Sequence, residues 1–191
     1  MPGKQAKILS TDHIDDLLFF ADNTRSPLRN RVIVLLSIKA GLRAGEIAKL
    51  TWEMLLGASG EIGVVLELRN QAAKMGSGRL IPLHPQLQQA LSALRQSSPG
   101  AGPVVCSERG GPMKPLSIVI WFERAYQALG FDGCSSHFGR RTFITRAARL
   151  VHKTGGSPRD VQLLAGHRSI QTTQRYIDGD SDAQRRLVSL I

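Results

Sequence analysis

Cysteine is scarce in this sequence: Cys106 and Cys134 are the only two among 191 residues. Two thiols are too few for a disulfide framework or for a set of zinc-binding cysteines. The longest apolar run, residues 32–38, is far shorter than a bilayer-spanning segment, and residues 1–4 lead into no signal-peptide hydrophobic region. We therefore expect a cytoplasmic protein with no membrane segment.

Acidic residues are also few. The chain has 15 Asp and Glu against 25 Lys and Arg, so its formal net charge is +10. Hydrophobic residues make up 42% of the chain and charged residues 21%, which is typical of a globular domain and excludes wholesale disorder. The excess of positive charge favours an acidic partner, and nucleic acid is the first candidate. Charge alone does not separate a ribosomal protein from a repressor or a DNA enzyme.

Hydrophobic periodicity and capping residues predict a mainly helical chain. Helices are expected from residue 11, over 28–40 and 44–50, from 85, over 116–129, 136–153, 157–166 and 169–177, and from 181. Residues 62–68 and 79–82 are rich in β-formers and flank a glycine turn, which indicates a small antiparallel sheet. We expect an α+β fold that is mainly α with a three-stranded antiparallel sheet. Its parts would be an extension over residues 1–10, one domain over 11–180 and a C-terminal helix over 181–191.

Polar residues stand out at four places in otherwise apolar, well-capped surroundings. These are Arg43 with Glu46 three residues later, Lys74 beside a glycine turn, His137 with Arg140 on one helix face, and His167 with Tyr176 nine residues later. Taken singly, each has an ordinary interpretation: a surface ion pair, a solvated lysine, a histidine satisfied by backbone groups, or a packing tyrosine. Their joint occurrence calls for a common explanation.

Together the four stretches resemble the catalytic domain of the tyrosine site-specific recombinases, the lambda-integrase family. The family pattern begins with an arginine in G-L-R-x-x-E, followed by a lysine on a β-hairpin and R-x-[VI]-P-L. It continues with H-x-x-R, then G-H, and a tyrosine nine residues on. The matching stretches here are residues 41–46, Lys74 with residues 79–83, residues 137–143 and residues 166–176. Each signal is weak alone, but their order and their placement on the expected elements make the combination specific.

The resemblance implies six catalytic residues. Arg43 and Arg140 would clamp the scissile phosphate of DNA, a task that suits the permanently charged, bidentate guanidinium. Lys74 would protonate the leaving 5′ oxygen. Tyr176 would attack the phosphorus and become a 3′-phosphotyrosine, His137 would accept the phenol proton, and His167 would donate a hydrogen bond to the phosphate.

The resemblance also implies supporting residues and partners. Glu46 would orient Arg43, and further DNA contacts would come from Arg79, Arg141, Arg168 and Arg175. The partner would be double-stranded DNA at specific recombination sites, bound by a tetramer that is a monomer when free. A nucleoid-associated location follows, and no cofactor or metal is expected.

Two features depart from the family. Gly139 stands where most members have a larger apolar residue, so either a neighbouring side chain fills the space or this helical turn is looser. Most members also carry a helical DNA-binding domain ahead of the catalytic one, whereas here only about ten residues precede the first expected helix. The C-terminal helix would either dock on a neighbouring subunit, as in the family, or pack on its own domain.

The expected function is site-specific cutting and rejoining of DNA strands through a 3′-phosphotyrosyl intermediate, without ATP. Two alternatives remain open. One is a catalytically silent DNA-binding regulator of recombination sites, which would form no covalent adduct. The other is a nicking–closing enzyme like the type IB topoisomerases, which would relax supercoiled DNA of any sequence.

Overall fold

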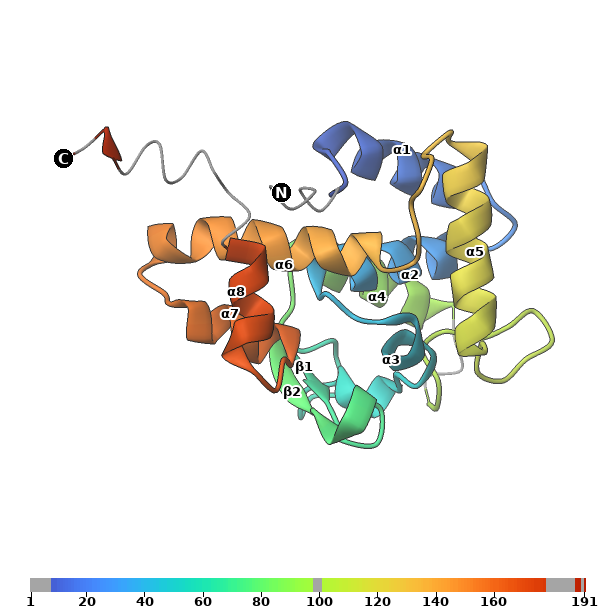
Figure 1. Cartoon of the computed structure of the whole chain (residues 1–191). Helices are drawn as coiled ribbons and strands as arrows, with labels where there is room; N and C mark the ends of the chain where they lie inside the picture. Colours follow the sequence, from blue (N-terminus) through green and yellow to red (C-terminus); the bar gives the residue numbers. More distant parts are fainter. Residues whose placement is uncertain (1–7, 98–100, 178–187, 190) are drawn as a thin grey trace.

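The computed structural model describes residues 8–97, 101–177, 188–189 and 191. The α-helices are α1 (Thr11–Asp22), α2 (Pro27–Lys39), α3 (Ala44–Ala48), α4 (Pro85–Gln96), α5 (Pro115–Ala128), α6 (Phe138–Leu150), α7 (Pro158–Ala165) and α8 (Ile170–Ile177). The strands are β1 (Val65–Leu68) and β2 (Arg79–Pro82), and three short 3-10 helices cover Trp52–Met54, Lys74–Gly76 and Val151–Thr154. In Figure 1, α6 crosses the middle of the molecule, with α1 above it and the β-hairpin below. The mainly helical fold with a small antiparallel sheet is confirmed.

Helix α2 is the centre of the main hydrophobic core. Ser26 and Pro27 begin the helix, since proline is well suited to the first helical turn. Every residue from Val32 to Ile38 is buried, and α1, α4 and α6 all pack against this helix. The unbroken apolar run therefore belongs to a helix enclosed on all sides rather than to an amphipathic surface helix.

Helix α6 separates this main core from a second, smaller one. Its first residue, Phe138, belongs to the main core. Farther along the helix, Ile144 and Ala148 pack with Val161 and Ala165 of α7, and the ring of Tyr176 lies against this second cluster. Figure 1 accordingly shows α7 and α8 gathered beneath one half of α6. The second core thus fixes the position of α8 relative to α6.

The sheet has two strands in the described residues, so the expected count of three is not confirmed. β1 and β2 pair antiparallel, with Leu66 opposite Ile81 and Leu68 opposite Arg79. The segment before β1 adds only an isolated bridge between Leu56 and Ile62. The chain reverses direction between these two residues, where Gly60 has a φ of 80°. Only one residue pair aligns across this reversal, so the bridge does not extend into a strand.

Gly139 is explained by close packing of α6 on α2. A Cβ atom at this position would overlap the Ser37 hydroxyl and lie 2.9 Å from the Ser37 Cβ. Ser37 is 1% exposed, and its hydroxyl has no hydrogen-bond partner in the part of the chain that the structure describes. The space that a larger residue would fill is therefore occupied by Ser37, and the two helices approach closely at this turn.

Replacing Gly139 with alanine should destabilise the protein by about 1–3 kcal/mol, because overpacking outweighs the better helix propensity of alanine. Chemical unfolding measures the change. The matched control is Gly45→Ala in α3, where no atom of the described residues lies within 4 Å of an added Cβ. The free energy of unfolding of this variant should stay equal or rise slightly. Ser37→Gly should recover part of the loss in the double variant. Equal effects at Gly45 and Gly139 would contradict this explanation.

The expected helix over residues 181–191 lies outside the described residues, apart from residues 188–189 and 191. Among the helices that are described, none combines the length and the apolar character that a membrane crossing requires.

Candidate functional site

Arg43 is fixed at the start of α3 by Glu46. The Arg43 backbone N–H donates to Oε2 of Glu46 at 3.0 Å, and its Nη1 donates to Oε1 at 3.0 Å. The preceding turn needs Gly41, which has a φ of 64° and whose added Cβ would overlap the Phe143 ring. The Arg43 side chain keeps 24% of its surface exposed, so the guanidinium can still meet a ligand.

Glu46 is buried between two arginines. Its side chain is 1% exposed, and Arg79 binds it bidentately, with Nη1 3.1 Å from Oε1 and Nη2 3.1 Å from Oε2. Burial alone would raise the pKa of Glu46, but the hydrogen bonds and charge of Arg79, and then those of Arg43, hold its pKa at about 2. The carboxylate therefore stays ionised and fully hydrogen-bonded inside the protein.

The structure does not favour Arg79 as a DNA contact. Its side chain is 5% exposed, and besides Glu46 it donates from Nε to the Leu164 carbonyl at 2.9 Å. A phosphate could reach this guanidinium only by displacing those partners. An arginine at the start of a strand beside a turn looks exposed in sequence, whereas its buried partner Glu46 lies 33 residues away.

Glu46 should make the stability of the protein sensitive to acid. Its folded pKa lies below the ordinary value of 4.5, so the stabilisation is present above about pH 4.5 and is lost as the pH falls toward 2. The difference between the ordinary and the folded pKa corresponds to about 3 kcal/mol in the free energy of unfolding. The test is urea unfolding between pH 7 and pH 3. At pH 7, the free energy of unfolding of Glu46→Gln should be much lower than that of the wild type, and this difference should become smaller as the pH falls. Glu67→Gln, which changes an exposed residue of β1, is the control; a gap independent of pH would contradict the prediction.

Arg140 is a buried cation of the site. It is 6% exposed, with Nη1 donating to the Gly41 carbonyl at 2.5 Å and Nη2 to the Ala165 carbonyl at 2.6 Å. Burial, and then the neighbouring Arg43, lower the pKa of Arg140 to about 9, so the group remains charged at neutral pH. Two backbone carbonyls from different parts of the chain thus fix this guanidinium while leaving some of its N–H groups available.

His167 and Tyr176 lie side by side. Their rings are stacked, with centroids 5.8 Å apart and an interplanar angle of 21°. His167 follows Gly166, which ends α7 in the left-handed region at a φ of 61°, and its Nδ1 is 2.9 Å from the Thr173 hydroxyl. Burial, and then Arg140, Arg43 and Arg79, lower the pKa of His167 to about 4, so the ring is neutral at pH 7.

His137 and Lys74 face a hollow of about 530 Å³ that Arg43 also lines. His137 is the N-cap residue of α6, and Lys74 is an exposed residue at the start of its 3-10 helix. Partial burial, and then four surrounding cations, lower the pKa of His137. Those cations are Arg43, Arg140, Arg141 and Lys74. The imidazole is thus held in its neutral form beside a strongly positive wall.

Electrostatic interactions and contacts link the six residues singled out in the sequence. Arg43 lowers and Tyr176 raises the pKa of Arg140. Arg43, Arg140 and Lys74 lower the pKa of His137, and the His167 ring stacks on Tyr176. The buried guanidinium connects the two ends of the site. Residues from α3, the hairpin, α6 and α8 therefore converge within one subunit, although Arg43 and Tyr176 are far apart in sequence.

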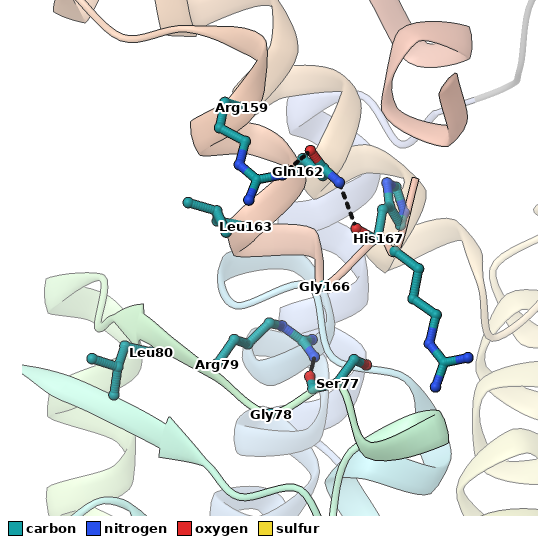
Figure 2. A pocket seen from close by; sticks show the side chains of 10 residues that line it. Ser77, Gly78, Arg79, Leu80, Arg159, Gln162, Leu163, Gly166 and His167 are labelled. Atoms are coloured by element: carbon teal, nitrogen blue, oxygen red, sulfur yellow. Dashed lines mark hydrogen bonds between the residues drawn. The ribbon is translucent and has the colours of Figure 1, made fainter. Parts of the chain in front are cut away.

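A second hollow of about 500 Å³ lies between β2 and α7. Figure 2 shows Arg79 reaching beneath Gly166, with Arg159 and Gln162 above it on α7. Arg168 lines the same hollow and is exposed, as is Arg175, whereas Arg141 is half-buried with its guanidinium 5.2 Å from the Phe138 ring centre.

Thr173 is a residue of the site that sequence reasoning missed. It is fully buried and holds Nδ1 of His167. Its position three residues before Tyr176 on a short helix was a usable signal, because that spacing places both on one face. Within the residues described, no group of three or more His, Cys, Asp or Glu side chains is arranged to hold a metal ion.

This chain is similar to known proteins in both sequence and fold. Residues 7–182 match the phage integrase family. The tyrosine recombinase XerC of Bradyrhizobium diazoefficiens is 31% identical over 163 residues, which cover 81% of this chain and 47% of that protein. XerC of Xylella fastidiosa is 30% identical over 179 residues, covering 91% of this chain and 56% of the relative. The chain thus spans about half the length of these relatives.

Solved structures share the fold. XerA recombinase superposes with a TM-score of 0.76 at 23% identity, covering all of this chain and 65% of that one. The Tn1549 transposon integrase, in complex with a circular intermediate DNA, gives a TM-score of 0.73 at 20% identity, covering 97% of this chain and 66% of that one. The matched segment of the sequence and the shared fold together show that the chain belongs to the phage integrase family and contains a tyrosine recombinase catalytic domain.

Proposed function

We propose that this chain cuts and rejoins DNA strands at specific sites through a 3′-phosphotyrosyl intermediate. The observation that carries the proposal is the placement of Tyr176 beside neutral His167 and next to the buried Arg140, within one subunit. A nucleophile, a hydrogen-bonding imidazole and a fixed cation are the groups that a phosphoryl transfer to tyrosine requires.

Stabilisation of the negative charge on the phosphate is the first requirement. The transition state gathers negative charge on the non-bridging oxygens, and Arg43 and Arg140 supply positive charge and several N–H donors for them. Arg140 is held by two carbonyls and Arg43 by Glu46, so little reorganisation accompanies the reaction. In the neutral tautomer whose Nδ1 accepts a hydrogen bond from the Thr173 hydroxyl, His167 carries its proton on Nε2, where it can donate to the phosphate.

Proton transfer is the second requirement. The phenol oxygen of Tyr176 forms a bond to phosphorus while the bond from phosphorus to the 5′ oxygen breaks. We assign His137 to accept the phenol proton, which its lowered pKa permits, and Lys74 to give a proton to the leaving 5′ oxygen. Attack by a 5′ hydroxyl reverses the step, so joining needs no ATP.

DNA binding would draw on the net charge of +10. We propose Arg141, Arg168 and Arg175 as phosphate contacts outside the reacting set, and Arg79 as a residue acting inside the protein. Residues 11–180 would form the catalytic domain, preceded by residues 1–10, and residues 181–191 would join protomers into a tetramer on DNA. Because DNA would be the substrate, the protein would be located at the nucleoid, in the cytoplasm.

The test is trapping of a covalent adduct. The wild-type chain is incubated with nicked duplexes that carry inverted repeats of about 10 base pairs from the DNA flanking its gene. We expect a denaturant-resistant protein–DNA adduct, with the DNA attached to the peptide that contains Tyr176. DNA binding without any adduct would favour the silent regulator. Relaxation of supercoiled plasmid regardless of sequence would favour the topoisomerase-like activity.

A further inference from the structure

Arg79 is built into the protein as a junction between three elements. It begins β2, contacts α3 through Glu46 and contacts the end of α7 through the Leu164 carbonyl. Nε and both terminal nitrogens of its guanidinium are used, and the side chain is 5% exposed. Only an arginine can satisfy this pattern, because a lysine ammonium lacks the planar fork that spans two carboxylate oxygens and a carbonyl.

Both partners of Arg79 stand next to proposed catalytic residues. Glu46 makes two hydrogen bonds to Arg43. Leu164 is followed by Ala165, whose carbonyl binds Arg140, and His167 comes two residues later. Neighbouring carbonyls at the end of α7 are thus held by Arg79 and Arg140, at the helix terminus where the backbone dipole favours cations.

Gly166 shows how closely this junction is packed. A Cβ atom there would lie 2.9 Å from Nη1 and 3.1 Å from Cδ of Arg79, and its φ of 61° already favours glycine. Figure 2 shows the guanidinium directly beneath the Gly166 backbone, where the chain turns toward His167. The turn before His167 therefore rests on the Arg79 side chain.

We propose that Arg79 is a positioning residue that keeps Arg43 and His167 at a fixed separation by binding Glu46 and the Leu164 carbonyl at the same time. The proposal rests on the proposed function, since it concerns how two residues are aligned for that reaction. If the junction is lost, Glu46 can rotate and Arg43 with it, while the turn before His167 loses its support. A misplacement of about 1 Å at a reacting centre can cost about 10²-fold in rate.

The experiment compares Arg79→Met, Arg79→Lys and Arg159→Met with the wild type. Arg159 lines the same hollow but is exposed, and its side chain donates a hydrogen bond to Gln162 of its own helix. Single-turnover adduct formation at saturating DNA should fall about 10²-fold for Arg79→Met and about tenfold for Arg79→Lys, whereas DNA affinity should change less than about threefold. Arg159→Met should keep the wild-type rate.

A double variant separates positioning from a general loss of structure. If Arg79 acts partly through Arg43, Arg79→Met should slow the Arg43→Lys enzyme by a clearly smaller factor than it slows the wild type. Equal factors in both backgrounds, or a wild-type rate for Arg79→Met, would overturn the proposal.

The remaining outcomes are also decisive. If Arg79→Met does not fold, Arg79→Lys takes its place in both backgrounds, because it keeps a positive charge facing Glu46. A wild-type rate for the folded lysine variant would then overturn the proposal. The absence of an adduct with the wild-type protein would instead overturn the proposed function, and this inference with it.

Discussion

Replacing Tyr176 with phenylalanine is expected to abolish the covalent protein–DNA adduct completely while leaving the fold and the affinity for DNA unchanged. The substitution removes one hydroxyl and keeps the ring that stacks on His167 and packs against α6 and α7. No other atom of the ring can attack phosphorus, so the loss should exceed any effect that depends on positioning or charge. Denaturing electrophoresis on a nicked duplex measures the adduct, and a binding assay at matched salt measures the affinity.

The chain provides a matched control, because Tyr126 is its only other tyrosine. Tyr126 is 1% exposed and stacks on Phe122, and its hydroxyl has no hydrogen-bond partner among the described residues. The Tyr126→Phe variant should therefore form the adduct as fully as the wild type does. Its free energy of unfolding should equal or exceed that of the wild type, since a buried unsatisfied hydroxyl is removed. If the adduct survives Tyr176→Phe and disappears with Tyr126→Phe, the nucleophile is Tyr126 of α5, and the assignment to Tyr176 of α8 is wrong.

Replacing Arg140 with glutamine is expected to affect both catalysis and stability. The buried carbonyls of Gly41 and Ala165 lose their donors, which should cost about 2–4 kcal/mol in the free energy of unfolding. The phosphate loses a preorganised cation, which should slow adduct formation by about 10²–10³-fold at saturating DNA. Chemical unfolding and single-turnover kinetics measure the two effects separately.

The neighbouring Arg141 supplies the comparison. Its guanidinium lies over the Phe138 ring, and the side chain is half-buried at the start of the same helix. Arg141→Gln should change stability by less than about 1 kcal/mol and should act mainly on DNA affinity, lowering the salt dependence of binding by about one charge. If the two variants lose adduct-formation rate to a similar extent, any positive charge at the start of α6 would explain the rate, and the geometry in which two carbonyls hold Arg140 would not be needed.

The helices could be predicted from sequence because their signals are local. Ser10 caps α1, Ser157 and Asp160 form a capping box at α7, and prolines begin α2, α4, α5 and α7. The extent of the sheet could not be predicted. β-forming residues before Val65 fit a strand equally well, and only the sharp reversal near Gly60 leaves them with one isolated bridge.

Gly139 illustrates the same limit for packing. Its departure from the family pattern was visible, but the residue that fills the space, Ser37, lies about a hundred positions earlier on another helix. A contact between distant segments leaves no periodic signal in one sequence, so the choice between a filled space and a loose turn needed coordinates.

By itself, the sequence determined the order and type of the helices, the positive charge, and the six residues whose spacing is typical of tyrosine recombinases. Those properties depend on near neighbours along the chain and on residue chemistry. Only the tertiary structure decided which cations are buried: Arg79 faces Glu46 and the Leu164 carbonyl, Arg140 is held by two distant carbonyls, and Thr173 sets the ring of His167. The reason is that desolvation and hydrogen-bond partners come from segments far apart in sequence, and these decide whether an arginine binds DNA or holds the protein's own site together.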